Sequence, residues 1–178
     1  VLLPVHESRN KGGGKGKKDI WVTSLTANGE WSSPMNLGDS INSPLNEVTP
    51  FIHANGQNLY FASDGYPGMG GYDLYVSEKD SIGTWGGPTN LGYPVNTKNN
   101  EGSLFLTPGF TWGYFEQYVR DGQRDYSLLY KFALPKELIS DNTCSYSKGI
   151  VTDKGSSLPI GTVIELYDLD TGELIQKV

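Results

Sequence analysis

Hydrophobic residues along the chain stand in short runs of about six residues, and glycine-rich or polar turns separate these runs. The clearest runs predict strands over 49–54, 58–63 and 73–78, with a turn at Asn55-Gly56 and a glycine-rich loop over 64–71. A further extended segment near Leu91 predicts a fourth strand. Because no stretch of useful length has the period of a helix, the pattern predicts an all-β chain.

The four predicted strands belong to a unit that recurs in the sequence. The segment WSSPMNLGDSINS at 31–43 corresponds to WGGPTNLGYPVNT at 85–97, with six of thirteen positions identical and an offset of 54 residues. The same offset relates further positions: Asp19 and Asp73, Glu47 and Glu101, Tyr60 and Tyr114, Phe61 and Phe115, Gly14 and Gly68, and Gly16 and Gly70. Four strands in a unit of this length are typical of one β-propeller blade. We therefore expect positions 54 residues apart to be equivalent, with Trp31 and Trp85 both largely buried.

The repeated motifs resemble a known family of propeller repeats. They are Asn-Leu-Gly-x-x-Ile/Val-Asn-Ser/Thr, then Asn-Glu at 46–47 and 100–101, LYFASDG at 59–65 and GGYDLY at 70–75. From residue 8 to about 134 the chain resembles the WD40-like (PD40) propeller repeat. That repeat occurs in periplasmic proteins related to TolB and in OmpA-family lipoproteins of Bacteroidetes-type bacteria. The resemblance implies that 1–134 is the C-terminal part of a propeller and that the protein is periplasmic and associated with the outer membrane.

A second resemblance follows the repeats. After a polar connector expected over 135–146, residues 147–178 contain LPIGTVIELYD at 158–168 and TGE at 171–173. These are similar to the start of a carboxypeptidase-regulatory-like domain, which is a small transthyretin-like β-sandwich, although Thr162 stands where that pattern often has Ala. The order of the two domains resembles OmpA-family lipoproteins that tether envelope machinery, including the type IX secretion apparatus, to peptidoglycan. This implies other envelope proteins as partners, with peptidoglycan bound only through a domain that this chain lacks.

Composition and charge narrow the choice of partner. The 178 residues carry a net charge of −6, which does not favour nucleic acid, although 1–18 is locally basic. No stretch is long and apolar enough to cross a membrane, so no direct membrane insertion is expected. The one cysteine, Cys144, cannot form a disulfide within the chain and is expected to be an inert thiol. The first residues begin in mid-pattern, so we expect an internal fragment or a processed piece.

Several carboxylates could carry chemistry. Asp19, Asp73 and Asp125 precede the expected third strand of each unit, and Asp64 follows the second. Such residues could act as glycosidase acids or ligate calcium, but they also commonly bond backbone N–H groups in turns. Repetition favours the turn, because a reaction needs one asymmetric set of groups.

The repeated glutamates lie between the last segment of one unit and the first strand of the next. Glu47 and Glu101 could form a ring of acids facing a central channel. The preferred interpretation is a hydrogen bond that bridges blades, together with Asn42 or Asn96.

Other conspicuous residues have simple structural interpretations. The loop GGGKGKK at 12–18 does not fit a P-loop and precedes a strand, so it is predicted to connect strands. The tryptophans could form a platform for sugars but are more simply core residues. His6 and His53 do not share the offset and give no zinc pattern. We therefore assign no catalytic, cofactor-binding or metal-binding residue, and expect no cofactor.

The expected function is a non-enzymatic scaffold or protein-interaction module of the periplasm. Its working parts would be loops such as 10–18 and 64–72. The alternatives are a propeller hydrolase or lyase acting on polysaccharide, and a propeller that binds glycan or peptide without catalysis. Because 1–134 supplies fewer than the about four blades that closure needs, we expect an open arc or free edges covered by another chain. The second domain is expected to be incomplete as well.

Overall fold

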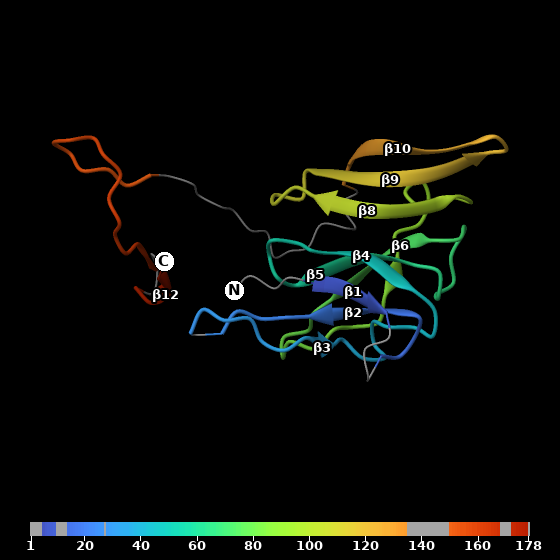
Figure 1. Ribbon diagram of the computed structural model, residues 1–178, viewed down its shortest axis with the longest axis horizontal. Coiled ribbons are helices and arrows are strands. Elements are labelled where there is room, and N and C mark those ends of the chain that lie inside the picture. Colours follow the sequence, from blue (N-terminus) through green and yellow to red (C-terminus); the bar gives the residue numbers. More distant parts are fainter. Residues whose placement is uncertain (1–4, 10–13, 27, 135–149, 168–171, 178) are drawn as a thin grey trace. The chain divides into compact units, whose positions relative to one another are not determined.

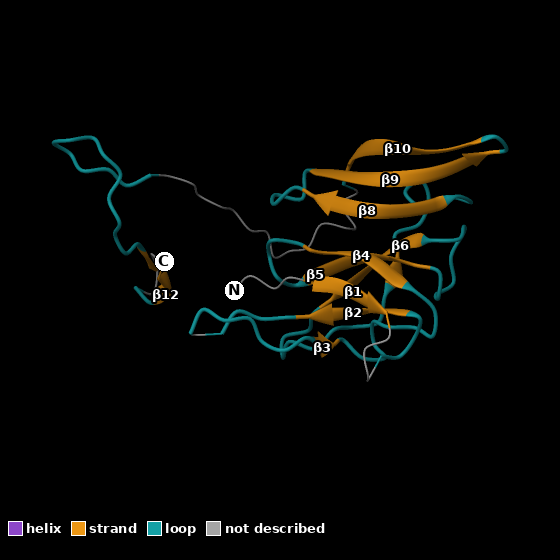
Figure 2. Cartoon of the chain, in the orientation of Figure 1, coloured by secondary structure: helices purple, strands orange, loops and turns teal. Residues whose placement is uncertain are grey.

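The computed structural model describes residues 5–9, 14–26, 28–134, 150–167 and 172–177. Within this part of the chain there are strands and no helix, so the prediction of an all-β protein is confirmed (Figure 2). The chain divides into two compact units, Val1–Ser145 and Tyr146–Val178. The expected connector over 135–146, with Cys144, lies outside the described residues.

The described part of the first unit contains three antiparallel sheets that follow one another along the chain and lie in layers (Figure 1). The first sheet contains β1 (Val5–Arg9), β2 (Lys18–Val22) and β3 (Met35–Asn36). The second contains β4 (Glu47–Ile52), β5 (Asn58–Ser63), β6 (Asp73–Glu78) and β7 (Thr89–Asn90). The third contains β8 (Asn100–Leu106), β9 (Trp112–Asp121) and β10 (Arg124–Ala133).

The offset of 54 residues relates the strands of these sheets. When 54 is added to its residue numbers, β3 coincides with β7. In the same way β1 falls within β5, and β4 falls within β8. The first sheet therefore holds the second to fourth strands of a unit, the second sheet holds all four, and the third holds the first to third. The strands predicted over 58–63 and 73–78 have the predicted bounds, whereas the strand predicted over 49–54 runs from Glu47 to Ile52.

The first strands of the second and third sheets, β4 and β8, each contain a bulge that the sequence pattern did not predict. Pairing shifts between Val48 and Phe51 in β4 and between Gly102 and Phe105 in β8. Thr49 and Ser103, 54 residues apart, have positive φ angles of 48° and 52°. Bulges bend a strand and interrupt its pairing.

The second sheet is buried on both faces, which explains the nearly unbroken apolar run in β5. Leu59 and Phe61 pack toward the first sheet in a cluster with Ile20. Tyr60 and Ala62 point the other way, into a cluster shared with the third sheet. Alternate side chains of one strand thus hold three sheets together.

The third sheet departs from the repeat by one residue. Phe61 pairs with Tyr75 in the second sheet, so the offset predicts that Phe115 pairs with Leu129. Phe115 instead pairs with Tyr130, and their rings stack with centroids 5.3 Å apart. The longer β9–β10 hairpin accounts for this shift, because its turn lies beyond the repeated positions.

This shift corrects the interpretation of Asp125. Asp73 begins β6 opposite Ser63, and the place opposite the equivalent residue Gln117 is taken by Leu128. Asp125 lies further out in the hairpin, where it pairs with Arg120 at 3.1 Å. Asp125 is therefore not a third copy of the repeated aspartate.

The described part of the second unit is a small antiparallel pair of strands. β11 (Glu165–Tyr167) pairs with β12 (Leu174–Lys177). Glu165 connects the two strands by a salt bridge to Lys177 at 2.8 Å, and it accepts a hydrogen bond from the Tyr167 hydroxyl at 2.7 Å. Apolar side chains of the second unit, among them Ile150 and Leu158, are exposed.

Gly70 lies in close contact with the connection between the second and third sheets, and its substitution tests this packing. A Cβ atom at Gly70 would overlap the carbonyl oxygens of Thr97 and Asn99, whereas one at Gly87 would meet nothing within 4 Å. We expect Gly70→Ala to lower the free energy of unfolding by about 1–3 kcal/mol, measured by urea denaturation. Gly87→Ala is the control and should change it by less than about 0.5 kcal/mol. Equal effects of the two substitutions would contradict this packing.

Candidate functional site: the glycine-rich loop face

The loop between β5 and β6 is held in one shape by residues of its own unit. Asp73 accepts hydrogen bonds from the backbone N–H groups of Met69 at 3.0 Å and Gly70 at 3.1 Å. The Tyr75 hydroxyl donates to the backbone oxygen of Tyr66 at 3.1 Å. Met69 remains 53% exposed at the tip. The loop therefore presents an apolar side chain on a fixed backbone.

The corresponding loop of the first sheet is fastened in the same way. Asp19 accepts hydrogen bonds from the backbone N–H groups of Lys15 and Gly16 and from the Asn36 side chain, the last at 2.8 Å. Because this carboxylate already occupies two loop amides, they do not form an empty cradle for phosphate. Asp64 likewise binds a backbone amide, accepting from Asn46 N–H at 2.9 Å in the segment before β4. These contacts favour the structural interpretation of the aspartates.

The repeated glutamates are buried inside the connection between sheets. Glu47 has no exposed surface and accepts hydrogen bonds from the hydroxyls of Ser43 at 2.6 Å and Ser63 at 2.8 Å. Glu101 is 2% exposed and accepts from Thr97 at 2.6 Å and Gln117 at 3.0 Å. These bonds fasten the connecting segment to the second strand of the unit that follows, and they leave neither carboxylate open to a channel.

The asparagines of the same connection bind backward, to the sheet that precedes it. Asn42 accepts from Ile20 N–H at 2.7 Å and donates to Ile20 O at 3.1 Å. Asn96 makes the same two bonds with Leu74, both at 2.8 Å. Both asparagines are buried, and each replaces the strand partner that one backbone N–H would otherwise lack. The two carbonyls also accept the backbone N–H groups of Leu37 and Leu91. The expectation that asparagine and glutamate act together is thus modified: each binds a different sheet.

Burial is the main influence on the Glu47 carboxyl. It raises the pKa of Glu47 above the usual value, and the hydrogen bonds from Ser43 and Ser63 partly oppose this rise. The nearby charge of Asp19 raises the pKa further. One oxygen of Glu47 has no hydrogen-bond partner in the described part of the chain. The ionised form of Glu47 is therefore less stable in the folded protein than in water.

The prediction that both repeated tryptophans are largely buried is wrong. Trp31 is 51% exposed, and Trp85 is only partly buried. Each lies beyond a turn at the outer end of its sheet, where it forms an isolated bridge, with Leu25 and Lys79 respectively. The sheets are too short there to cover an indole ring on both sides. Lys79 Nζ lies 4.7 Å from the centre of the Trp85 ring.

Among the described residues there is no group of three potential metal ligands. His53 is buried, with Nε2 3.1 Å from Thr107 O and its ring 3.7 Å from the centre of the Phe110 ring. His6 lies in β1, opposite Trp21.

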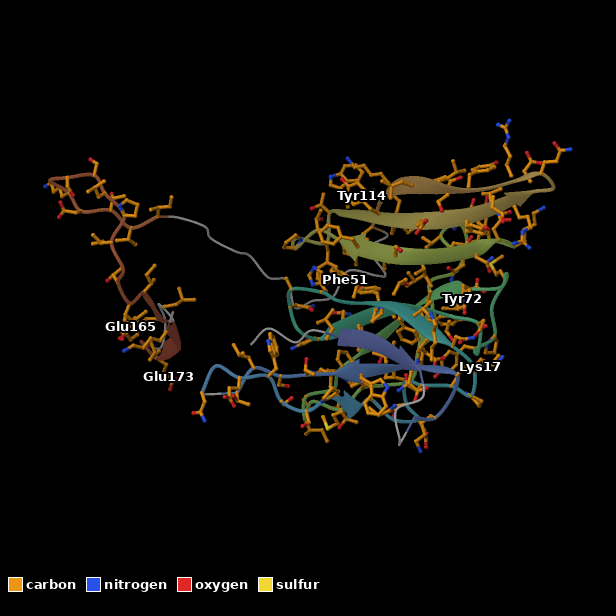
Figure 3. All side chains as sticks on the ribbon, in the orientation of Figure 1. Lys17, Phe51, Tyr72, Tyr114, Glu165 and Glu173 are labelled. Carbon is orange, nitrogen blue, oxygen red and sulfur yellow. The ribbon has the colours of Figure 1, made fainter. Side chains whose placement is uncertain are left out.

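A crevice of about 380 Å³ separates the two loops. Lys15 lines it from the first loop, and Gly65 and Tyr66 line it from the second. Lys15 forms an exposed salt bridge with Asp39 at 3.0 Å, and the Tyr66 hydroxyl donates to Ile41 O at 2.9 Å. Burial raises the pKa of Tyr66 to about 12, so its hydroxyl stays protonated. Figure 3 shows Lys17 and Tyr72, one from each loop region, at the same end of the sheets. We call this end the loop face.

A second crevice, of about 310 Å³, opens between the first and second sheets near their outer strands. It is lined by Trp85 and Lys79 from the second sheet and by Met35 and Leu37 from the first. This volume lies at the lower end of the range for small-molecule sites.

Comparison with known proteins gives no family for this chain: no family model, curated protein or solved structure matches it. Among the described residues, no helix is long and apolar enough to span a membrane.

Residue-type reasoning missed one repeated feature of the connection. Ser103 N–H donates to Thr49 Oγ1 at 3.1 Å, which joins the first strands of two sheets. The signal was present in the sequence, because the two hydroxyl residues are 54 positions apart. This spacing did not predict the contact, because a serine or threonine in a strand does not by itself indicate a bulge.

The raised pKa of Glu47 predicts a pH dependence. Because its folded-state pKa lies above the unfolded value near 4.5, its contribution to stability is complete below that pH and is lost as pH rises through the folded-state pKa. Glu47→Gln cannot ionise. The unfolding free energy of the wild type relative to this variant should therefore fall in urea titrations as the pH rises above 4.5.

The control is Glu30→Gln, which removes a charge from an exposed turn and should leave the pH profile unchanged. A relative stability of the wild type that rises with pH would contradict the burial of a strained carboxylate at position 47.

Proposed function

We propose that this chain is a non-enzymatic scaffold and protein-interaction module of the bacterial periplasm, associated with the outer membrane. Its three sheets would be blades of a WD40-like (PD40) propeller, and 147–178 would begin a carboxypeptidase-regulatory-like sandwich. The partners would be other envelope proteins, including those of a secretion apparatus of the type IX kind. Peptidoglycan would be held by a domain outside this chain, and nucleic acid is not an expected partner of a chain with net charge −6.

One observation carries the proposal: the repeated acids are all used to hold the fold. Asp19 and Asp73 bind the amides of their own loops, and Glu47 and Glu101 bind side chains of the connections between sheets. A catalytic acid needs access to a substrate, which these buried groups lack.

The loop face supports docking as the positive function. Its loops are bound internally through Asp73, Tyr75 and Asp19, so little conformational entropy is lost when a partner binds. It also combines an exposed apolar side chain, Met69, with the basic Lys15 and Lys17. Such a surface suits a protein partner with a complementary acidic rim.

A glycan- or peptide-binding propeller is the second candidate, and the outer crevice is what favours it. Trp85 offers an indole ring there, and Lys79 a charge that could meet a carboxylate. A polysaccharide hydrolase or lyase would need two unlike carboxyl groups facing one cleft, roughly 5–10 Å apart.

The proposal predicts contact without turnover. With a photo-cross-linking amino acid at position 69, the chain should form one defined cross-linked product with an envelope protein, identified by mass spectrometry. The same amino acid at Ile82, which is 85% exposed on a different turn, is the control and should not form that product. Incubation with peptidoglycan and with neutral and acidic polysaccharides should release no new reducing or unsaturated ends.

Two results would contradict the proposal. One is release of glycan ends that is lost on replacing a single Asp or Glu. The other is identical cross-linking from positions 69 and 82, which would show that the loop face has no special role.

A further inference from the structure

The two faces of the third sheet are covered unequally. Phe115 and Phe132 face the second sheet and belong to the core there. The opposite face, which we call the outer face, carries Phe105, Trp112, Tyr114, Glu116, Leu129 and Lys131, as the strand pairing requires. Leu129 is 77% exposed and Trp112 is 40% exposed. Figure 3 shows Tyr114 on the third sheet and Phe51 between the second and third sheets.

The equivalent face of the second sheet is a buried contact between sheets. Tyr60 occupies there the place that Tyr114 occupies in β9, and it is 1% exposed. Leu74, opposite Ala62, occupies the place of Leu129, and it has no exposed surface. The third sheet covers these side chains. In this chain the equivalent face of the second sheet is thus covered by the opposite face of the sheet that follows it.

Two substitutions within the repeat make the outer face different. Glu116 stands at the place of Ala62, and Lys131 at the place of Val76. Lys131 Nζ lies 4.0 Å from the centre of the Trp112 ring, and Glu116 accepts a hydrogen bond from Ser103 at 3.2 Å. Both charges therefore have partners within their own sheet, which lowers the cost of covering them.

The charges of the outer face are balanced. Glu116 and Lys131 lie on a diagonal across β9 and β10, because Tyr114 pairs with Lys131 and Glu116 pairs with Leu129. Arg120 and Asp125, which pair with each other further along, add one charge of each sign. A second copy of this chain, with its net charge of −6, would be repelled at most surfaces but not at a neutral one.

We propose that the outer face of the third sheet binds the same face of a second copy, so that the chain forms a two-fold symmetric dimer. The two-fold axis lies between the two third sheets, parallel to them and perpendicular to the diagonal that joins Glu116 to Lys131. Rotation about this axis exchanges the positions of these two residues. Lys131 of each copy then faces Glu116 of the other, while Tyr114 meets Tyr114 and Leu129 meets Leu129. A two-fold interface needs only one self-complementary surface, which this face supplies. The dimer rests on the proposed function, because it gives the interaction module two loop faces.

Charge reversal tests this arrangement directly. The full 178-residue chain should sediment as a concentration-dependent dimer, and Lys131→Glu and Glu116→Lys should each raise the dimer dissociation constant at least tenfold. Mixed in equal amounts, the two variants should form a heterodimer close to wild-type strength, because each charge regains an opposite partner. Circular dichroism and thermal unfolding confirm that both variants are folded.

An apolar pair of variants checks the same face independently. Leu129→Glu should also weaken the dimer at least tenfold, whereas Ile82→Glu, at an 85% exposed site on another turn, should not. A monomer at every concentration, a dimer that Leu129→Glu leaves intact, or charge variants that do not rescue each other would overturn the proposal. The cross-linking from position 69 should persist in Leu129→Glu, so failure of the dimer and failure of the scaffold function are distinguishable.

Discussion

A buried asparagine side chain fixes the path of the chain from each sheet to the next. The last strands, β3 and β7, are only two residues long, so they cannot pair with the whole of β2 or β6. Asn42 and Asn96 supply the missing partner of one N–H group each, that of Ile20 or Leu74. Each also donates to the carbonyl of the same residue, which accepts a backbone N–H of the connection as well. An unpaired buried amide or carbonyl costs about 1–3 kcal/mol, so the connection has little freedom to take another path.

The remaining architecture follows from this constraint. Once the connection is fixed, Glu47 or Glu101 binds the strand ahead, and the next sheet begins against the one before it. The second sheet is then buried on both sides, which requires apolar residues at consecutive positions of β5. The repeated aspartates and glutamates, which could have been catalytic or metal-binding residues, form hydrogen bonds within this framework. The proposed interactions therefore use surfaces that the framework presents, namely the loop face and the outer face of the third sheet.

The sequence predicted the strands where local pattern and repetition agree. The bounds of β5 and β6 follow from apolar runs between glycine-rich turns, and the roles of Asp19 and Asp73 follow from their recurrence. The register of β10 could not be read in this way, because it depends on the length of the β9–β10 hairpin rather than on residue types. Trp31 was misjudged because its burial depends on where the sheet ends. The outer face became visible only when pairing assigned Glu116 and Lys131 to the same side.

The most direct measurement is the free energy of unfolding of the two asparagine variants. Asn42→Ala and Asn96→Ala should each lose about 1–3 kcal/mol in urea titrations, because each leaves one buried N–H, that of Ile20 or Leu74, without a partner. Asn28→Ala, in an exposed turn, should change the stability by less than about 0.5 kcal/mol. Losses below about 1 kcal/mol at both buried sites would contradict the central role of the asparagines in joining the sheets.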